Sequence, residues 1–576
     1  MHGTFLVCFV AGIAGCSRSE ISATSGAADP AAWGGGLVAS IRSEPRTFNR
    51  LVARDVVSSL VAELTQASLV RIDKVDDKVE PWLAEGWTRS ADGLSYEFQL
   101  RPHVRFSDGE PLTSEDVLFT FEAVYSVGGP LADSLRINGK ELTASKKDDA
   151  TVVVTFPGPF SPGIRILDSL PILPKHRLQS ALEAGQLAEA WGVATPPGEM
   201  PGLGPFVLAD YQPGQRLVFA RNLYYWRVSP DGEQLPRLDR LTLQIVPDQD
   251  TEVLRLEAGE IDFTQSEVRA EDYTALRLAA DEGRGQLIEL GVALDADFLF
   301  FNLQPDAMSE DPRQSWLQAD GFRRAIAHAV DRQSFADTVY LGLGEPVHGP
   351  ITASNHRWYN PDVDVYEYDV EMARAQLEAV GLSDRDQDGF LESVQGQRAR
   401  FTLLTQRGNT IRERAAAVIA EDLRQIGITV DVVALEFGAL IERVTNMDFD
   451  AVYLGFRTSD TDPAANLDLW LSDSAFHFWN PSQEVPATDW EARIDELMLA
   501  QMVTPDEAER KRLFDEVQDI FAEYVPALYF AAPRVVIAIS PRVANARPAL
   551  LEPMMLWNAD TLGGEPAPLR SRAVTR

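Results

Sequence analysis

The segment from residue 400 to residue 435 limits the fold more than any other part of the chain. Arg400–Thr405 and Ile428–Leu435 both have the composition of β-strands. Between them, Thr410–Glu413 matches a capping box, and apolar residues then recur at helical spacing as far as Gly427, a residue suited to the left-handed end of a helix. A strand, a helix and a strand with short connections predict a βαβ unit with parallel strands and a right-handed crossover. The fold class is therefore expected to be α/β.

The rest of the chain also mixes the two kinds of element. Ser95–Phe106 alternates as a strand does, a helix is expected to begin at Thr113, and another is expected from Thr504, with Pro505 in its first position. The length of 576 residues corresponds to about three to five domains of ordinary size. A formal net charge of −35 argues against a nucleic-acid partner, because contacts to phosphate need a basic surface.

The first residues indicate the compartment. Thr4–Ile13 is apolar, too short for a transmembrane helix of about 20 residues, and of the right length for a secretory signal. It leads into Ile13-Ala14-Gly15-Cys16, which resembles a bacterial lipobox. The resemblance implies cleavage before Cys16 and a lipid on that cysteine, so that the protein is anchored to a membrane and faces the periplasm or the cell surface. The alternative is an ordinary signal peptide in which Cys16 occurs by chance.

The predicted signal peptide is residues 1–15, and it contains the other cysteine, Cys8. Residues 16–36 are rich in serine, alanine and glycine, a composition typical of a flexible tether. After Cys16 no thiol remains in the sequence to form a disulfide, ligate a metal or act as a nucleophile. No later window holds about 18 apolar residues, so no transmembrane helix is predicted.

Signatures of the common enzyme classes are missing from the sequence. It contains no Gly-x-Ser-x-Gly elbow, no phosphate-binding Gly-x-x-x-x-Gly-Lys loop and no dinucleotide-binding Gly-x-Gly-x-x-Gly. The seven histidines are scattered, with no spacing typical of metal ligands. Paired carboxylates are too frequent in so acidic a chain to single out a glycosidase pair. No catalytic residue is therefore predicted, and the chain is not expected to be an enzyme.

One acidic loop has the pattern of a cation site. Asp384–Gly389 places carboxylates at alternate positions and a glycine at the sixth, as a calcium loop does. The twelfth position, where a bidentate glutamate belongs, holds Gln395, and Glu392 at the ninth could compensate. The loop predicts either a structural Ca²⁺ site or a plain Asp/Gly surface turn, and no other cofactor is expected. The candidate ligands are Asp384, Asp386 and Asp388.

Several further motifs occur in one order from about residue 35 to residue 541. They are Glu80–Trp87, Ser90–Gly93, Tyr96–Arg101, Val104–Thr113, Leu173–His176, Gly202–Phe206, Arg324–Ile326, Ala329–Arg332 and Gly427–Val430. Together they resemble the family 5 extracellular solute-binding proteins, which are the dipeptide-, oligopeptide- and nickel-binding lipoproteins of ABC importers. Most of these residues are expected in turns and packing positions rather than at a ligand.

The resemblance implies an α/β fold of two lobes, with a hinged cleft between them and an extra domain inserted in the first lobe. The implied division is residues 37–48, 202–292 and 525–560 for the first lobe, 49–201 for the inserted domain, 293–524 for the second lobe and 561–576 for a C-terminal tail. Such a protein works by closing on its ligand, because both lobes contact the ligand only in the closed state. The implied partners are a peptide or another small solute and the permease subunits of an ABC transporter.

The resemblance also points to the ligand site. Peptide binders of this family hold the free amine of the ligand on the aspartate of Gly-Trp-x-x-Asp-x-x-acid-Pro. Here the segment is Gly455–Pro463, where Ser459 takes the position of that aspartate, Asp460 follows one residue later and Asp462 keeps the acid before proline. Either Asp460 serves through a different loop conformation, or no amine is bound in this way, and oligosaccharides, opines or other solutes stay open.

Other side chains near this segment have alternative roles. Arg457 could receive a carboxylate as a two-pronged fork, or it could be a surface arginine. Trp470 and Trp479 could stack on sugar rings or fill side-chain pockets, or they could belong to the core of the lobe. A peptide-importing receptor is the first hypothesis, the same fold with an oligosaccharide or another non-peptide solute is the alternative, and a secreted hydrolase is the rival class. The candidate ligand-binding residues are Phe456, Arg457, Ser459, Asp460, Asp462, Trp470 and Trp479.

Overall fold

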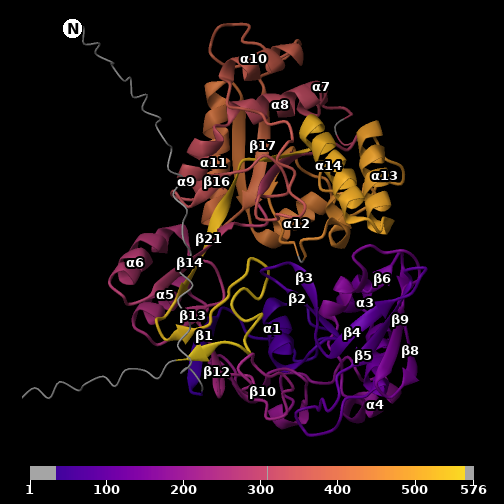
Figure 1. The fold of residues 1–576 in the computed structure, drawn as a ribbon. Helices are drawn as coiled ribbons and strands as arrows, with labels where there is room; N and C mark the ends of the chain where they lie inside the picture. The colour runs from indigo at the N-terminus through magenta and orange to yellow at the C-terminus, as the bar shows by residue number, and fades with distance from the viewer. Residues whose placement is uncertain (1–33, 306, 308, 459, 565–576) are drawn as a thin grey trace, which may run out of the picture.

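The computed structural model describes residues 34–305, 307, 309–458 and 460–564. The predicted signal peptide, Cys16 and Ser459 lie outside these residues. The described chain forms two lobes, each built on a mixed β-sheet flanked by helices, and a separate antiparallel sheet lies beside the first (Figure 1). The predicted two-lobed α/β fold is confirmed.

The sheet of the first lobe is assembled from distant parts of the chain. Its strands are β1 (Gly36–Ile41), β10 (Phe206–Gln212), β11 (Arg216–Arg221), β12 (Arg240–Ile245), β13 (Phe263–Thr264), β14 (Gln286–Val292), β16 (Gly344–Pro346) and β21 (Ala531–Ile539). In the described chain they follow the order β10-β11-β12-β1-β13-β21-β14, and β16 pairs with Ala531–Pro533, the end of β21 that lies at the second lobe (Figure 1). β1 is parallel to β12 and β13, and both β13 and β14 are antiparallel to β21. The sheet therefore has one edge at which four parallel strands end, namely β1, β12, β13 and β14.

The sheet of the second lobe contains the predicted βαβ unit. Its strands are β15 (Phe298–Phe301), β17 (Arg400–Gln406), β18 (Thr429–Leu435), β19 (Ala451–Leu454) and β20 (Ala527–Tyr529). Within the described ranges their order is β18-β17-β19-β15-β20. β17 and β18 are parallel, in register from Arg400 opposite Thr429, and helix α11 (Thr410–Gln425) connects them. The βαβ prediction is confirmed, and Gly427 has the expected positive φ of 87° after the helix.

The start of α11 differs by one residue from the prediction. The capping residue is Asn409, whose side chain accepts a hydrogen bond from the amide of Arg412 at 3.1 Å. The Glu413 carboxylate accepts from the amide of Gly408 at 2.9 Å instead of from Thr410. Asparagine caps a helix as well as threonine does, so Thr410 becomes the first helical residue.

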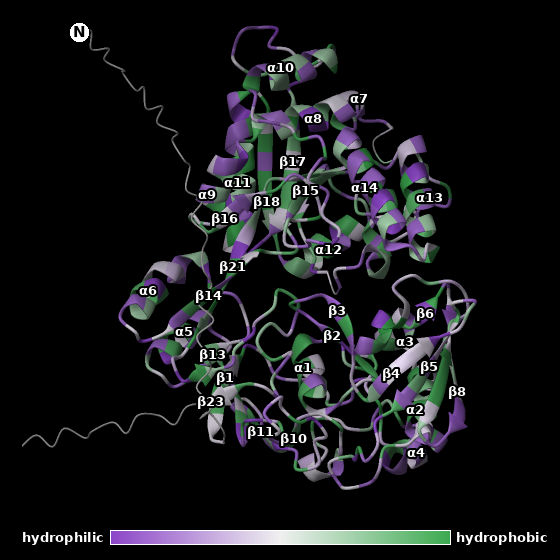
Figure 2. Ribbon diagram, viewed as in Figure 1, coloured by the Kyte–Doolittle hydropathy of each residue, from purple (hydrophilic) through white to green (hydrophobic). Residues whose placement is uncertain are grey.

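Alternate residues of the second sheet face two different cores. Leu299 and Phe301 lie in one core with the inner faces of α8 (Asp320–Ala329), α9 (Arg332–Val339) and α11. Phe298 and Phe300 lie in the other core with α12 (Phe437–Thr445), α13 (Asp489–Val503) and α14 (Glu507–Tyr524). This alternation is the period of two that a strand imposes. Figure 2 shows apolar residues along the strands and polar residues on the outward sides of the surrounding helices.

Two connections of the described chain run between the lobes. Residues 293–297 join β14 to β15, and β21 passes from the second lobe, where Ala531 and Ala532 are buried, to the first, where Val535 is buried. The predicted division assigned residues from 525 onward to the first lobe. β20 instead pairs with β15, so the chain crosses after Phe530, within β21. A boundary of this kind depends on which distant strand a short apolar run pairs with.

The residues between β1 and β10 build their own structure. The strands β4 (Ala84–Arg89), β5 (Ser95–Leu100), β8 (Thr143–Asp148) and β9 (Thr151–Thr155) form an antiparallel sheet, and β2 (Val70–Asp73) pairs with β3 (Lys78–Pro81). Their helices are α1 (Val56–Thr65), α2 (Ser114–Val127), α3 (Pro130–Ser134) and α4 (Lys175–Glu183). α2 begins after Thr113 as predicted, and the Asp116 carboxylate accepts from the Thr113 amide at 2.9 Å. The buried residues of this region belong to the same apolar core as those of the first sheet. The inserted domain stays a prediction.

Both ends of the described chain are more ordered than expected. Residues 34–36 were assigned to the tether, yet the Gly34 amide donates to the Arg237 carbonyl at 2.9 Å and β1 begins at Gly36. The predicted tail begins at residue 561, yet Leu562 is fully buried and β23 (Gly563–Gly564) pairs with β22 (Val543–Ala544). Both segments are rich in small residues, and their partners lie far away in the sequence.

The remaining helices cover the sheets. α14 starts two residues later than the sequence suggested, because Asp506 is its cap and accepts from the Glu509 amide at 2.8 Å, while Thr504 ends α13. No helix of the described ranges has both the length and the apolar character needed to cross a bilayer. The other helices are α5 (Gln249–Glu257), α6 (Ala270–Asp281), α7 (Gln314–Leu317) and α10 (Val370–Ala379).

Candidate functional site

The loop that follows β19 lies where the two lobes face each other. β17 and β19 are parallel, so the segment beginning at Gly455 leaves the sheet at the same edge as the turn before α11. Because β15 is antiparallel to β19, residues 293–297, which precede β15, reach that edge as well. In α/β sheets the carboxyl ends of the parallel strands are where ligands bind.

Position 455 requires a glycine because the connection formed by residues 293–297 approaches it closely. A Cβ atom at this position would lie 2.2 Å from Asp297 Oδ1 and 2.9 Å from Asp297 Cα. Asp297 is itself held by Arg412 at the start of α11, with hydrogen bonds of 2.8 and 2.9 Å. Arg412 also donates to the Gly455 carbonyl at 3.1 Å. The first residue of the predicted binding segment therefore serves packing.

A second aspartate of residues 293–297 holds Thr458 in place. Asp295 accepts from the Thr458 amide at 3.0 Å and from its hydroxyl at 2.8 Å. Burial raises the pKa of Asp295, and the two bonds from Thr458 oppose that rise. The loop is thus tied to residues 293–297, one of the connections between the lobes.

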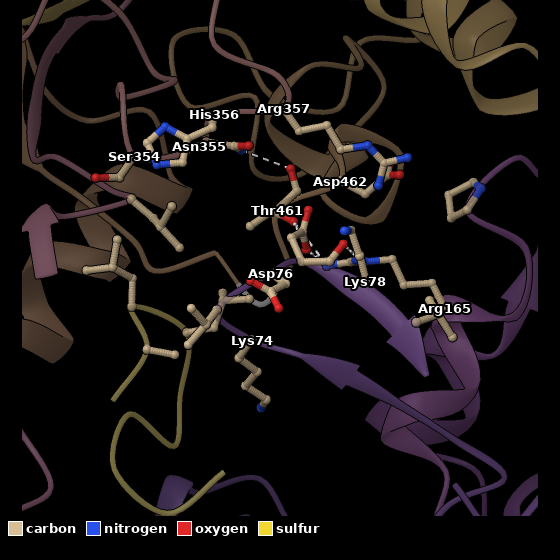
Figure 3. A pocket seen from close by; sticks show the side chains of 18 of the residues that line it. Lys74, Asp76, Lys78, Arg165, Ser354, Asn355, His356, Arg357, Thr461 and Asp462 are labelled. Atoms are coloured by element: carbon tan, nitrogen blue, oxygen red, sulfur yellow. Dashed lines mark hydrogen bonds and ion pairs between the residues drawn. The ribbon is translucent and has the colours of Figure 1, made fainter. Parts of the chain in front are cut away.

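Four cavities of the described structure meet at this loop, and we refer to them together as the interlobe cleft. The largest is about 830 Å³ and lies between β2 and β3 of the first lobe and Thr461 and Asp462 of the second (Figure 3). The others are about 360, 350 and 40 Å³. Thr458 lines the three smaller cavities, and Leu294 lines the largest and two of the others. The four cavities share lining residues and therefore adjoin one another, and the largest alone is large enough for a small molecule or a short peptide.

Asp460 is already engaged across the cleft. Both of its carboxylate oxygens accept hydrogen bonds from Arg165 Nε, at 2.7 and 2.8 Å. Arg165 belongs to the short 3₁₀ helix Gly163–Ser169 beside β2, and it also binds Asp77 Oδ1 at 2.5 Å and Thr461 Oγ1 at 3.0 Å. Figure 3 shows its side chain extending toward Thr461. The carboxylate predicted to receive a ligand amine is therefore paired with an arginine of the protein.

Asp462 has a structural environment. Its carboxylate accepts from the Ala464 amide at 2.9 Å and from Arg510 at 2.7 and 3.0 Å, and only 1% of the residue is exposed. It thereby caps the short helix Pro463–Ala465 and anchors it to α14. Asp462 lies on the wall of the largest cavity, although its carboxylate is turned to these internal partners.

The predicted aromatic residues divide between cleft and core. Phe456 lines two of the cavities and packs edge-on against Phe298, with ring centres 6.1 Å apart. Trp470 reaches the smallest cavity, but it is 97% buried and packs on Phe514. Trp479 is 99% buried, packs on Phe521 and lines none of the four cavities. Trp479 therefore lies in the core of the second lobe, which was the alternative to a ligand contact.

Arg457 forms another contact between the lobes. Its guanidinium lies 3.0 Å from Glu267, which follows β13 in the first lobe, and its side chain is 67% exposed. A ligand carboxylate would have to compete with Glu267 for this arginine. Ser459, between Arg457 and Asp460 in the predicted site, is outside the described residues.

Several cleft residues had no signal in the sequence. Glu63, Asp77, Arg165, Glu267 and Asp295 come from separate segments, and none belongs to a recognisable motif. Each is a charged residue in a chain that is rich in them. Only the folding of the first lobe against the second brings them to one cleft.

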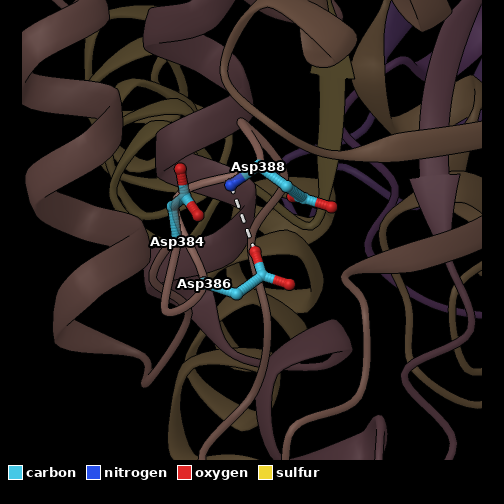
Figure 4. Close-up of side chains that lie close together, drawn as sticks. All are labelled: Asp384, Asp386 and Asp388. Atoms are coloured by element: carbon cyan, nitrogen blue, oxygen red, sulfur yellow. Dashed lines mark hydrogen bonds between the residues drawn. The ribbon is translucent and has the colours of Figure 1, made fainter.

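The acidic loop lies far from the cleft in sequence and forms an exposed group. Ligand atoms of Asp384, Asp386 and Asp388 lie within 4.8 Å of one another (Figure 4). Each carboxylate accepts from a backbone amide of the loop at 3.0 to 3.1 Å, and Asp388 also pairs with Arg398. These bonds are what an Asp/Gly turn makes without an ion. The Ca²⁺ site stays a prediction.

Comparisons with known proteins agree with this architecture. Residues 78–478 match the family described as bacterial extracellular solute-binding proteins, family 5 middle. The chain is 31% identical over 466 residues to the oligopeptide-binding protein AppA of Bacillus subtilis, covering 79% of each protein. It is 27% identical over 556 residues to a probable ABC transporter-binding protein of Deinococcus radiodurans, covering 92% of each. The structure of B. subtilis AppA in complex with a nonapeptide matches with a TM-score of 0.68 at 26% identity, over 93% of this chain and 99% of that one.

Proposed function

The chain belongs to the family 5 bacterial extracellular solute-binding proteins, and on that premise we propose that it captures peptides in the interlobe cleft and delivers them to the permease of an ABC importer. The observation that supports this most directly is the group of adjoining cavities at the loop after β19, the largest of which has walls from both lobes. Its relative AppA of B. subtilis is an oligopeptide-binding protein, and the structure of AppA holds a nonapeptide.

The proposed mechanism is closure. Residues 293–297 and the first half of β21 form the two connections, and Thr458 is fastened to the first of them by Asp295. A ligand that touches both lobes stabilises the closed state by its differential affinity for that state. The permease would recognise the closed arrangement. In this proposal no bond of the ligand is made or broken, and the peptide is released unchanged.

We also propose that Cys16 carries a lipid that anchors the protein to a membrane, with the protein facing the periplasm or the cell surface. The support is the lipobox-like sequence before Cys16. The Cys16→Ser variant is expected to leave the membrane fraction and to keep its ligand affinity. A Ser variant that sediments with membranes as the parent does would contradict the lipid anchor and leave the binding function untouched.

The test of the binding function is native mass spectrometry of the body from Ser17 onward, purified without refolding. A closed binding protein releases ligand slowly, so cargo from the cell is expected to remain bound. Adduct masses that decompose into amino-acid residues support peptide capture and give the length of the peptide. Adducts spaced by hexose or pentose units would leave the assignment of the fold intact and identify the ligand as an oligosaccharide instead of a peptide. Incubation of the released peptide with fresh protein should return its mass unchanged, and cleavage would favour a hydrolase.

A further inference from the structure

Arg165 is the buried centre of a network that joins the two lobes. Its side chain is 4% exposed and lies between Asp77, in the turn between β2 and β3, and Asp460, in the loop after β19. Thr461 Oγ1 accepts from Arg165 at 3.0 Å and donates to Asp77 Oδ1 at 2.8 Å. Asp77 and Arg165 belong to the first lobe, whereas Asp460 and Thr461 belong to the second.

The bonding capacity of the Asp460 carboxylate is largely used inside the protein. Besides the two bonds from Arg165 Nε, its Oδ1 accepts from the Asp462 amide at 2.9 Å. A carboxylate has about four lone-pair sites, and two donors, the shared Nε–H of Arg165 and the Asp462 amide, make three contacts to them here. Only 16% of the Asp460 side chain is exposed. An incoming ammonium group would have to compete with Arg165 for both oxygens of Asp460.

The neighbouring acid of the same loop is paired as well. Asp462 is bound by Arg510 through two hydrogen bonds, with 2% of its side chain exposed. Both carboxylates between Thr458 and Pro463 therefore have an internal guanidinium partner. This wall of the cleft therefore carries its own guanidinium groups at the two positions where a cationic end of the ligand could bind.

A second contact shows that the same part of the first lobe meets the second lobe directly. The Ser161 amide donates to the Met502 carbonyl at the end of α13, at 2.7 Å. Ser161 lies four residues before Arg165, so the 3₁₀ helix that carries Arg165 is held against the second lobe from two sides. Arg165 is thus positioned by contacts to both lobes.

From this geometry we propose that Arg165 determines ligand specificity by taking the place of a ligand ammonium on Asp460, so that the cleft accepts peptides whose N-terminal amine is blocked as well as those whose amine is free. The proposal rests on the proposed function, peptide binding, and adds which peptides are bound. Arg165 is a specificity-determining residue, because it acts on the ligand through Asp460.

The test is a competition read by native mass spectrometry. The probe is an equimolar pool of synthetic peptides of three to nine residues, each present in free-amine and N-acetylated form, added to ligand-stripped protein. For the parent protein the ratio of acetylated to free peptide bound is expected to be within about threefold of one. In Arg165→Met the unpaired Asp460 becomes available to an amine, and the ratio should fall by tenfold or more.

Two further variants keep the result interpretable if Arg165→Met does not fold. Asp460→Asn removes the carboxylate and should keep the ratio near one. Arg357→Met is the matched control, because Arg357 lines the same cavity and pairs with Glu507 within the second lobe at 2.9 Å. It should also leave the ratio unchanged.

The outcomes separate the two proposals. A parent protein that binds free-amine peptides at least tenfold better than acetylated ones overturns the role of Arg165 while peptide binding stands. A drop of the ratio in Arg357→Met equal to that in Arg165→Met overturns it too, since the effect would then be one of cavity charge in general. A parent protein that binds no member of the pool overturns the proposed peptide function, and with it this inference.

Discussion

Asp462 and Arg510 form a doubly hydrogen-bonded ion pair inside the second lobe, with N–O distances of 2.7 and 3.0 Å. Their side chains are 2% and 4% exposed. Arg510 Nε also donates to the Gln501 carbonyl at 3.0 Å, so the pair connects the loop after β19 to both α13 and α14. The acid before proline in the binding segment therefore supports the loop from within the lobe.

Replacing Asp462 is expected to destabilise the protein rather than to weaken a ligand contact. Asp462→Asn leaves the buried Arg510 without its counter-charge, a change that costs about 3–5 kcal/mol of unfolding free energy. Urea unfolding followed by circular dichroism measures this. The exposed Asp468 of the same segment is the control, and Asp468→Asn should change stability by about 0.5 kcal/mol or less. A double variant, Asp462→Asn with Arg510→Gln, should recover part of the loss, and equal losses in the single and double variants would contradict the pairing argument.

Gly455→Ala is expected to disturb the loop because the added Cβ meets residues 293–297. The nearest atoms belong to Asp297, and one of them, its Cα at 2.9 Å, is backbone that has little room to move. The expected cost is about 1–3 kcal/mol of stability, together with weaker ligand binding. Gly438→Ala in α12 is the matched control: nothing lies within 4 Å of its added Cβ, and helix propensity predicts a gain of up to about 1 kcal/mol. If both variants were equally stable, the close approach at Gly455 would be of no consequence.

Asp422 in α11 is expected to make stability depend on pH. Burial, together with the charges of Asp331 and Glu421, raises the pKa of Asp422 to about 6. The unfolded chain has a pKa of about 3.9, so the folded state binds the proton more tightly, and ionisation destabilises it as the pH rises from about 4 to above 6. Asp422→Asn should therefore add about 2 kcal/mol at pH 7 and almost nothing at pH 4. Thermal unfolding of both proteins at the two pH values tests this, and an equal gain at both would assign the effect to packing.

The acidic loop can be tested by metal addition. If Asp384, Asp386 and Asp388 hold Ca²⁺ with the dissociation constant of about 1 mM seen in extracellular modules, Ca²⁺ at about tenfold excess should stabilise the protein by about 1.4 kcal/mol. The measurement is the melting temperature with and without Ca²⁺, with Mg²⁺ as the control ion. Asp386→Asn should abolish the increase. A Ca²⁺ response that persists in this variant, or no response in the parent, would identify the loop as a surface turn.

The fold could be predicted wherever a pattern repeats over a few residues. The βαβ unit at 400–435, the helix after Thr113 and the end of α11 at Gly427 are local features, and all three are confirmed. The predicted starts of α11 and α14 were wrong by one and two residues, because Asn409 and Asp506 are capping residues as good as the threonines beside them. The predicted return of the chain to the first lobe at residue 525 was too early in the sequence. The reason is that β20 is a three-residue strand that pairs with β15, more than 200 residues away.

For the site, the sequence determined the segment and the tertiary structure decided its chemistry. The family resemblance pointed to Gly455–Pro463, and the described residues of this segment do lie at the cleft. Whether Asp460 is open to a ligand depends on Arg165, which lies 295 residues away in the chain. An ion pair of this kind leaves no periodic trace in a sequence, since any arginine could supply it. Its partner is chosen only when two lobes, each folded by its own apolar core, are brought face to face.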